Sequence, residues 1–171
     1  INVDNLAELD RVSKLIGITT PAGTIGLRIN PQVGTGSIKE SSVAGIYSKF
    51  GVPIGNCRTE LEKAFLTYPW LTGVHLHVGS QGCPLDMLVS GTGTLYDFTV
   101  EMNQKRERQG FQEINIFDAG GGMPVTYHPS VPGPSMKDYA GQILRRAPGL
   151  RNMKIITEFG RWVYVNSGWT V

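Results

Sequence analysis

The sequence predicts an α/β protein that forms part of a (β/α)8 barrel of the TIM type. Apolar runs typical of buried parallel strands alternate with segments whose apolar residues recur at helical spacing. Strict alternation implies a parallel sheet with crossover helices. The 171 residues suffice for about five βα units, because eight units take roughly 250 residues. The competing doubly wound sheet usually carries a Gly-x-Gly-x-x-Gly turn after its first strand, and none follows the predicted strands here.

The first half of the chain contains two predicted strands and two predicted helices. They are a strand end at 1–3, a helix at 6–16, a strand at 24–30 and a helix at 58–66. Asp4 or Asn5 can cap the first helix, and Gly17 can end it. Pro31 ends the strand, and a loop with little apolar content follows over residues 32–42. A long loop at such a place is more often functional than decorative.

The second half continues the alternation. Its predicted elements are a strand at 71–78, a helix at 85–109, a strand at 114–117, a loop at 123–135, a helix at 136–146 and a strand at 154–157. Gly91 and Gly93 weaken the first half of the long helix, and Gly110 stops it. Segment 161–167 fits either a helix or a strand.

Composition excludes several classes of protein. Hydrophobic residues make up 40% and charged residues 18%, which fits a soluble globular domain. The net charge is +2, and Glu107 interrupts the short basic run at 105–108, so we expect no nucleic-acid partner. No apolar stretch reaches the roughly 18 residues of a membrane span, and no signal peptide is visible. We therefore expect a cytoplasmic protein without a membrane partner. Cys57 and Cys83 alone make neither a disulfide framework nor a zinc site.

Both ends of the chain look like cuts within a longer protein. Ile1 opens on what looks like the end of a strand, and Val171 stops abruptly. About five βα units cannot close an eight-stranded barrel, so an isolated piece would expose apolar strand edges. We expect the segment to be a domain excerpt or to self-associate.

Three predicted strands end in polar or glycine-rich stretches, at 73–81, 114–122 and 153–161. Gly120, Gly121 and Gly122 can adopt positive φ, and their N–H groups can form a nest for an anion, most commonly phosphate. A tight turn is the alternative. Ser80 can add a hydroxyl donor, and Arg161 can bind a phosphate or carboxylate with two hydrogen bonds.

His75 and His77 lie two residues apart on a strand, so both point to one face. Such a pair can ligate a metal. Alternatively, one imidazole packs flat on an aromatic ligand, or His75 is a satisfied core histidine. A metal site needs more ligands, and the third histidine, His128, lies in a predicted loop. We therefore predict no metal.

Two charged residues belong to apolar strands. Glu158 ends one, and an isolated buried carboxylate needs a cationic partner or a proton. Arg161 can be that partner, or the ring nitrogen of a bound heterocycle can take its place. Arg28 lies inside another strand, where it either forms a structural ion pair or contacts a ligand.

Six short motifs in chain order resemble one family. They are Asn2-Val-Asp4, Leu27-Arg-Ile-Asn-Pro31, Ser48-Lys-Phe-Gly51, Gly73-Val-His-Leu-His-Val-Gly-Ser-Gln81, Asp118-Ala-Gly-Gly-Gly122 and Glu158-Phe-Gly-Arg161. Together they resemble the fold-type III pyridoxal-phosphate-dependent decarboxylases, the group of diaminopimelate, ornithine and arginine decarboxylases with an alanine racemase-like barrel. The diaminopimelate branch is the most similar.

The resemblance implies a pyridoxal 5'-phosphate cofactor and a role for each matching residue. His77 would stack on the pyridine ring, Glu158 would bond the ring nitrogen, and Arg28 would lie near the ring. Arg161 would also face the substrate carboxylate. The phosphate would be surrounded by Ser80, Gly120, Gly121, Gly122, Gly160 and Arg161. Glu158 and His77 would be the catalytic residues of this chain.

The resemblance also implies an amino-acid decarboxylase, a carboxy-lyase that releases CO2 from its substrate. Residues 1–171 would be the central to C-terminal part of the cofactor barrel. The Schiff-base lysine would lie upstream, and a C-terminal β domain downstream, so the piece alone would be inactive. The full-length enzyme would be a homodimer with Lys49 near the subunit interface. A racemase of this fold has a cation at the pyridine nitrogen, so Glu158 favours the decarboxylase.

Two alternatives stay open. Phe159 stands where the family has proline, which presets the backbone, and this departure is compatible with a non-catalytic or inhibitory homologue that binds the cofactor. A metal-dependent barrel hydrolase would instead use His75 and His77.

Overall fold

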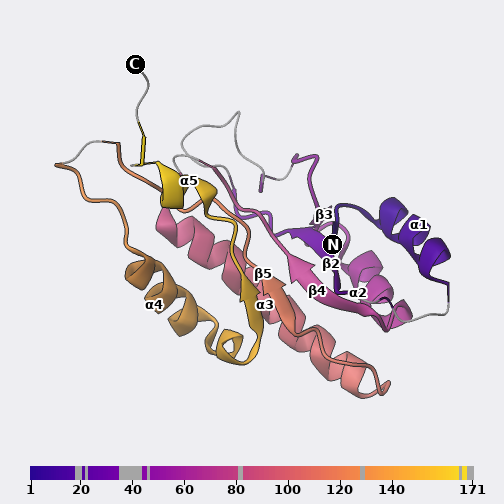
Figure 1. Cartoon of the computed structure of the whole chain (residues 1–171). Coiled ribbons are helices and arrows are strands. Elements are labelled where there is room, and N and C mark those ends of the chain that lie inside the picture. The colour runs from indigo at the N-terminus through magenta and orange to yellow at the C-terminus, as the bar shows by residue number, and fades with distance from the viewer. Residues whose placement is uncertain are drawn as a thin grey trace.

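The strands follow one another in space in the same order as in the chain. The computed structural model describes residues 1–17, 21, 23–34, 44–45, 47–80, 83–127, 130–165 and 167–168. Its sheet has the order β1 (Asn2–Val3), β2 (Ile25–Asn30), β4 (Leu71–His75), β5 (Ile116–Asp118) and β6 (Lys154–Ile156), with the short β3 (Val52–Pro53) paired beside β2 (Figure 1). All of these pairings are parallel.

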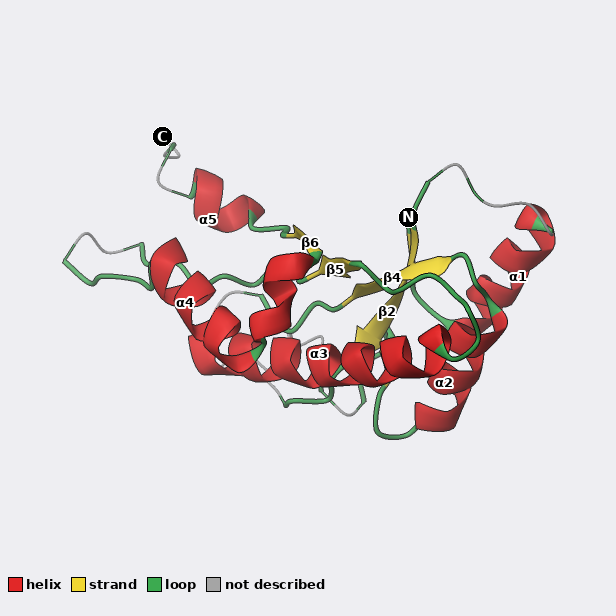
Figure 2. Ribbon diagram, turned by 90° about the horizontal axis from the view of Figure 1, so that it is seen from below, coloured by secondary structure: helices red, strands yellow, loops and turns green. Residues whose placement is uncertain are grey.

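A helix follows each strand of the main path. The helices are α1 (Leu6–Ile16), α2 (Arg58–Thr67), α3 (Leu85–Glu107), α4 (Met136–Arg146), the 3-10 helix η2 (Pro148–Asn152) and α5 (Gly160–Tyr164). Figure 2 shows α2, α3 and α4 on the same side of the sheet. A doubly wound sheet reverses its strand order at a switch point, whereas this order never reverses. The prediction of a partial barrel with about five βα units is therefore confirmed.

The outer face of the sheet packs under the helices. Leu27, Val74 and Phe117 stand side by side on β2, β4 and β5 and are completely buried. Leu95 and Phe98 of α3 belong to the same buried cluster. Burying a side chain of this size stabilises a fold by about 1.5–3 kcal/mol, so this layer holds the helices on the sheet.

The inner face carries a polar layer. Arg28, His75 and Asp118 are in register on β2, β4 and β5, and they point away from the helices because successive strand residues alternate between faces. Gly26 and Gly73 are also in register, two residues before Arg28 and His75 and on the same face of the sheet. Arg28, His75 and Asp118 therefore place ionisable groups on the inner face of the partial barrel.

Glycines keep the long helix close to its neighbours. A Cβ at Gly91 would lie 2.5 Å from Val78 Cγ2, and a Cβ at Gly93 would lie 2.5 Å from Arg146 Nε. The two glycines predicted to weaken the first half of the helix leave α3 unbroken. Close packing against the loop after β4 and against α4 accounts for their presence.

Arg106 is a buried cation that binds backbone carbonyls. Its Nη2 donates to Pro69 O at 2.9 Å, its Nε to Gln112 O at 2.8 Å, and its Nη1 to Phe65 O. Burial lowers the pKa of Arg106 to about 10. The basic run at 105–108 is therefore not a surface patch, because Arg106 joins the end of α2 to the loop before β5.

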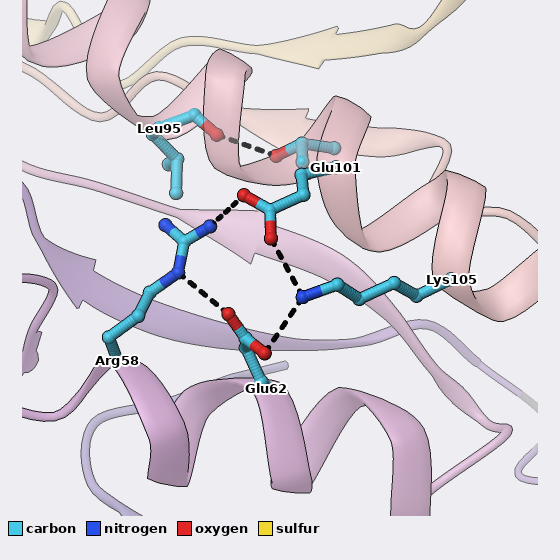
Figure 3. A network of polar contacts seen from close by, with 6 residues as sticks. Arg58, Glu62, Leu95, Glu101 and Lys105 are labelled. Carbon is cyan, nitrogen blue, oxygen red and sulfur yellow. Dashed lines mark hydrogen bonds and ion pairs between the residues drawn. The ribbon is translucent and has the colours of Figure 1, made fainter.

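The exposed edges of α2 and α3 are joined by four alternating charges (Figure 3). Glu62 accepts from Arg58 Nε at 3.0 Å and from Lys105 Nζ at 2.8 Å. Glu101 lies 2.7 Å from Lys105 and also pairs with Arg58. Both carboxylates thus bridge the same two cations.

Several element boundaries differ from the sequence prediction. The strand predicted at 71–78 ends at His75, where its pairing with both β2 and β5 stops. Sequence reasoning missed β3 altogether. Segment 161–167 begins as a helix, α5, and Asn5 caps α1 by accepting from Glu8 N.

Parts of some predicted features lie outside the described residues. These are most of the loop predicted at 32–42, together with Gln81 and His128. Of the helices in the described part of the chain, none combines the length and apolar character that crossing a membrane requires.

Candidate functional site

A cavity of about 180 Å³ lies beyond the carboxyl ends of the last three strands. Its lining comes from the loops after β4, β5 and β6 and from the start of α5. The lining residues are His77, Ser80, Gly121, Gly122, Met123, Glu158, Phe159, Gly160, Arg161 and Trp162. Seven residues that the sequence singled out therefore share one cavity, whereas Arg28 and Gly120 do not line it.

The glycine triplet lets three loops approach one another. Gly120 and Gly122 have φ of +65° and +94°, which side chains rarely tolerate. A Cβ at Gly120 would lie 2.1 Å from Leu76 O, and one at Gly122 would lie 2.4 Å from Gly79 O. The loop after β5 is therefore pressed against the loop after β4, which favours glycine regardless of any ligand.

Two of the three glycine N–H groups already have partners. Gly120 N donates to Asp118 Oδ1 at 3.0 Å, and Gly121 N donates to His77 Nδ1 at 3.3 Å. Within the described residues, the Gly122 N–H has no acceptor. Of the three glycine N–H groups predicted to bind an anion, the Gly122 N–H therefore remains available to a ligand.

His77 lies between the glycine loop and a carboxylate. Its Nδ1 accepts from Gly121 N and also lies 3.4 Å from Glu158 Oε2. One nitrogen cannot accept from the first and donate to the second at the same time. His77 Nδ1 can therefore bond only one of these two neighbours at a time.

Glu158 is not a buried carboxylate. Its side chain is 43% exposed, because β6 is the edge strand and its residues are exposed. The interpretation that a buried Glu158 would pair with Arg161 is wrong. Its oxygens lie near His75 and His77, while Arg161 Nη1 donates to the Tyr127 hydroxyl at 2.7 Å.

His75 is buried but not satisfied. It is 7% exposed, and neither ring nitrogen has a hydrogen-bond partner among the described residues. Its Nε2 lies 3.8 Å from Glu158 Oε1, beyond hydrogen-bond range. Burial lowers the pKa of His75, although the Asp118 and Glu158 carboxylates oppose this shift, so the imidazole is neutral at neutral pH. The interpretation of a satisfied core histidine is therefore wrong.

Arg28 has structural partners. Its Nη1 lies 3.2 Å from Asp4 Oδ1, and its guanidinium lies 4.8 Å from the centre of the Phe50 ring. Arg28 also stands beside His75 in the sheet. The ion-pair interpretation thus describes the contacts that Arg28 makes in this structure.

Three apolar residues of the cavity were not predicted to be site residues. They are Met123, Phe159 and Trp162. Phe159 is 7% exposed, and its ring packs edge to face on Tyr139 of α4, with centres 5.0 Å apart. Its φ of −80° lies at the edge of the range that proline fixes. The substitution of the family's proline therefore retains a proline-like φ and adds an anchor for α4. All three lie in the segments that follow β5 and β6, and that position was the signal that could have found them.

Comparison with known sequences identifies relatives over almost the whole chain. Residues 1–165 match the family described as pyridoxal-dependent decarboxylase, pyridoxal binding domain. Diaminopimelate decarboxylase from Haemophilus influenzae is 32% identical over 169 residues, which are 98% of this chain and 39% of the relative. The Aquifex aeolicus enzyme of the same name is 30% identical over 168 residues, with the same coverage.

Solved structures of diaminopimelate decarboxylases also superpose on this chain. Helicobacter pylori diaminopimelate decarboxylase complexed with L-lysine superposes with a TM-score of 0.70 at 28% identity, over 94% of this chain and 39% of that one. The enzyme from M. jannaschii in complex with L-lysine gives 0.67 at 27% identity, over 94% and 37%. The chain thus spans about two-fifths of the length of these relatives. It belongs to the pyridoxal-dependent decarboxylase family and corresponds to the pyridoxal binding domain of that family.

Proposed function

We propose that the complete gene product is a pyridoxal-phosphate-dependent amino-acid decarboxylase, most like diaminopimelate decarboxylase. Residues 1–171 would form the central to C-terminal part of its cofactor barrel. The observation that carries the proposal is the convergence of His77, Ser80, Glu158 and Arg161 on one cavity. The family match and the relatives named diaminopimelate decarboxylase support it.

The donor set fits the two ends of pyridoxal phosphate. One end is a basic ring nitrogen, for which the Glu158 carboxylate is a suitable partner. The other is a phosphate, which needs donors. The Ser80 hydroxyl, the Gly122 N–H and the Arg161 guanidinium line the same cavity and can supply them. A Cβ at Gly160 would meet nothing within 4 Å, so space for a ligand remains beside this residue.

Each side chain would have a distinct task. Bound pyridoxal phosphate accepts the electron pair that is left when CO2 departs. Glu158 would hold the proton at the ring nitrogen, which strengthens that acceptor. The flat His77 imidazole would lie on the ring and fix its orientation. Arg28 would act from beside His75, through the charge it brings to the inner face of the sheet.

Arg161 has two possible anions to bind, the cofactor phosphate and the substrate carboxylate. It now bonds the Tyr127 hydroxyl, a neutral partner that an anion would outcompete. None of the described residues that line the cavity is a lysine. By the resemblance to the family, the lysine that joins the cofactor would lie upstream of residue 1.

We further propose a cytoplasmic homodimer with Lys49 near the subunit interface, on the strength of the resemblance to the family. Lys49 Nζ lies 5.2 Å from the centre of the Phe50 ring. Light scattering of the complete gene product tests this proposal. A dimer that Lys49→Glu dissociates is expected, and a monomer would contradict it.

The test of function is CO2 release by the complete gene product supplied with pyridoxal phosphate. Diaminopimelate, lysine, ornithine and arginine are offered in parallel, and we expect diaminopimelate to react fastest. Glu158→Gln should lower kcat, because a neutral amide cannot hold the ring-nitrogen proton. Binding of the cofactor without CO2 release from any of these amino acids would favour the non-catalytic homologue. Failure to bind the cofactor would overturn the proposal.

A further inference from the structure

The inner face of the half-barrel contains one cluster of metal-ligand side chains within the described residues. His75, His77 and Glu158 each present one ligand atom, and the three atoms lie within 4.8 Å of one another. We propose that, when no cofactor occupies the cavity, these three side chains bind a divalent transition-metal ion such as Zn²⁺.

The distances are close to those of a zinc site. His77 Nδ1 lies 3.4 Å from Glu158 Oε2, and His75 Nε2 lies 3.8 Å from Glu158 Oε1. Ligand atoms about 2.0–2.1 Å from a tetrahedral zinc ion are about 3.4 Å apart. Because the three ligand atoms lie within 4.8 Å of one another, the side chains would need to move together by about 1 Å to close a tetrahedral set.

The second, independent observation is the state of His75. Its side chain is 8% exposed, and both of its nitrogens lack partners among the described residues. Buried polar atoms normally have a hydrogen-bond partner, and none of the described side chains or backbone groups supplies one to the His75 nitrogens, which leaves them free to act as ligands. A cation between His75 and Glu158 would satisfy both groups.

The charges around the cluster suit a divalent cation. Two imidazoles and one carboxylate leave one positive charge on the complex, and Asp118, which is in register with His75, can offset it. Arg28 opposes binding from the other side, but Asp4 pairs with it. Three protein ligands would leave the fourth position of the metal open to water. Metal binding would break the 3.3 Å hydrogen bond from Gly121 N to His77 Nδ1.

The cluster shares two of its three side chains with the proposed cofactor site. His77 and Glu158 cannot bind a metal and contact the pyridine ring at the same time, so metal and cofactor would exclude one another. This mutual exclusion rests on the proposed function, whereas metal binding by itself does not.

The experiment is a Zn²⁺ titration of the cofactor-free complete gene product against a chromogenic chelator. We expect a site whose affinity falls at least about 10-fold in Glu158→Gln and in His75→Gln, since loss of outer-shell partners alone costs 10–100-fold. Glu113→Gln, an exposed substitution outside the cluster, serves as the matched control for Glu158→Gln and should leave the affinity unchanged. Absence of zinc binding, or equal affinity in wild type and Glu158→Gln, would overturn the inference.

Two further measurements keep the result interpretable. Thermal unfolding identifies a variant that has lost its fold, and the half-exposed Glu158 offers a substitution that spares the core if His75→Gln does not fold. Saturation with pyridoxal phosphate before the titration should abolish zinc binding at this site. If zinc binds equally with and without the cofactor, the metal site stands and the proposed cofactor position fails. If the cofactor binds but the cofactor-free protein takes up no zinc, the proposed function stands and this inference fails.

Discussion

Asn2 Nδ2 donates a hydrogen bond of 2.8 Å to Asp118 Oδ2, so the first strand of the sheet is joined to the fourth across its inner face. The contact is possible because the strands between them carry glycine. A Cβ at Gly26 would lie 2.6 Å from Asn2 Oδ1, and Gly73 stands beside Gly26. The bond holds the Asp118 carboxylate beside His75, at the base of the candidate site.

Removal of this bond should destabilise the barrel. Asn2→Ala leaves a buried carboxylate oxygen without its donor, which costs about 1–3 kcal/mol in the free energy of unfolding, as measured in urea. Asn56→Ala is the matched control, because Asn56 makes its contact with Gln32 at the surface, where a change within about 0.5 kcal/mol is expected. Equal effects of the two substitutions would contradict this role for Asn2.

Arg106 should be irreplaceable by lysine. Lys has one ammonium in place of a planar fork, so it cannot reach the carbonyls of Phe65, Pro69 and Gln112 together. Each buried carbonyl that loses its hydrogen-bond donor costs about 1–3 kcal/mol. We therefore expect Arg106→Lys to lower the free energy of unfolding by about 3 kcal/mol. Arg108→Lys, two residues along at an exposed position, should have almost no effect. A stable Arg106→Lys variant would show that water replaces the guanidinium.

The two cysteines should differ in reactivity. Cys83 is buried, and burial raises its pKa to about 11, so almost no reactive thiolate exists at pH 8. Cys57 is half-buried. Alkylation of the native protein at pH 8, followed by mass spectrometry of its peptides, should label Cys57 well before Cys83. Faster labelling of Cys83 would contradict its burial.

Cys83 should also make stability depend on pH in the alkaline range. Its pKa of about 11 in the folded state exceeds the value of about 8.5 expected for an unfolded thiol. The unfolded state therefore releases its proton first, and the contribution of Cys83 to stability declines as pH rises from about 8.5 to 11. Urea unfolding at pH 8 and pH 10 should show a smaller alkaline loss in Cys83→Ala than in wild type. An identical loss of stability in the two proteins would show that groups other than Cys83 cause the alkaline destabilisation.

The charge network between α2 and α3 should be sensitive to salt and acid. Hydrogen bonds from Lys105 and Arg58 lower the pKa of Glu62, so its contribution is complete above the unfolded pKa and is lost as pH falls through the folded one. Glu62→Gln should lower the thermal midpoint slightly at low salt and not at 1 M salt, where charges are screened within about 3 Å. Glu113→Gln, an exposed substitution outside the network, is the control. A loss that is unaffected by salt would indicate packing rather than charge.

The alternation of helices and strands was predictable because it depends on local apolar periodicity. Four helices and the order of the strands follow from that pattern alone. The end of β4 at His75 did not follow, because it depends on where the pairing with β2 and β5 stops. Pairing between strands distant in the chain leaves no local signal.

The candidate site, like the fold, was only partly predictable from the sequence. His77, Glu158 and the glycine triplet were visible as polar or flexible residues that end apolar runs. The unpaired His75 and the Asn2–Asp118 bond were not, because both result from the register of neighbouring strands. Arg106 was visible only as part of a short basic run, since a sequence does not show which carbonyls surround a side chain.

The most direct test of the account is a titration of pyridoxal phosphate into the cofactor-free complete gene product, followed by its visible absorbance. Saturable binding is predicted, with Arg161→Ala weakened by about 10- to 100-fold, because a charge-assisted hydrogen bond contributes about 1.5–3 kcal/mol. Arg151→Ala, an exposed change in η2, should bind like wild type. Absence of binding, or equal affinity in Arg161→Ala and wild type, would contradict the claim that this cavity holds the cofactor.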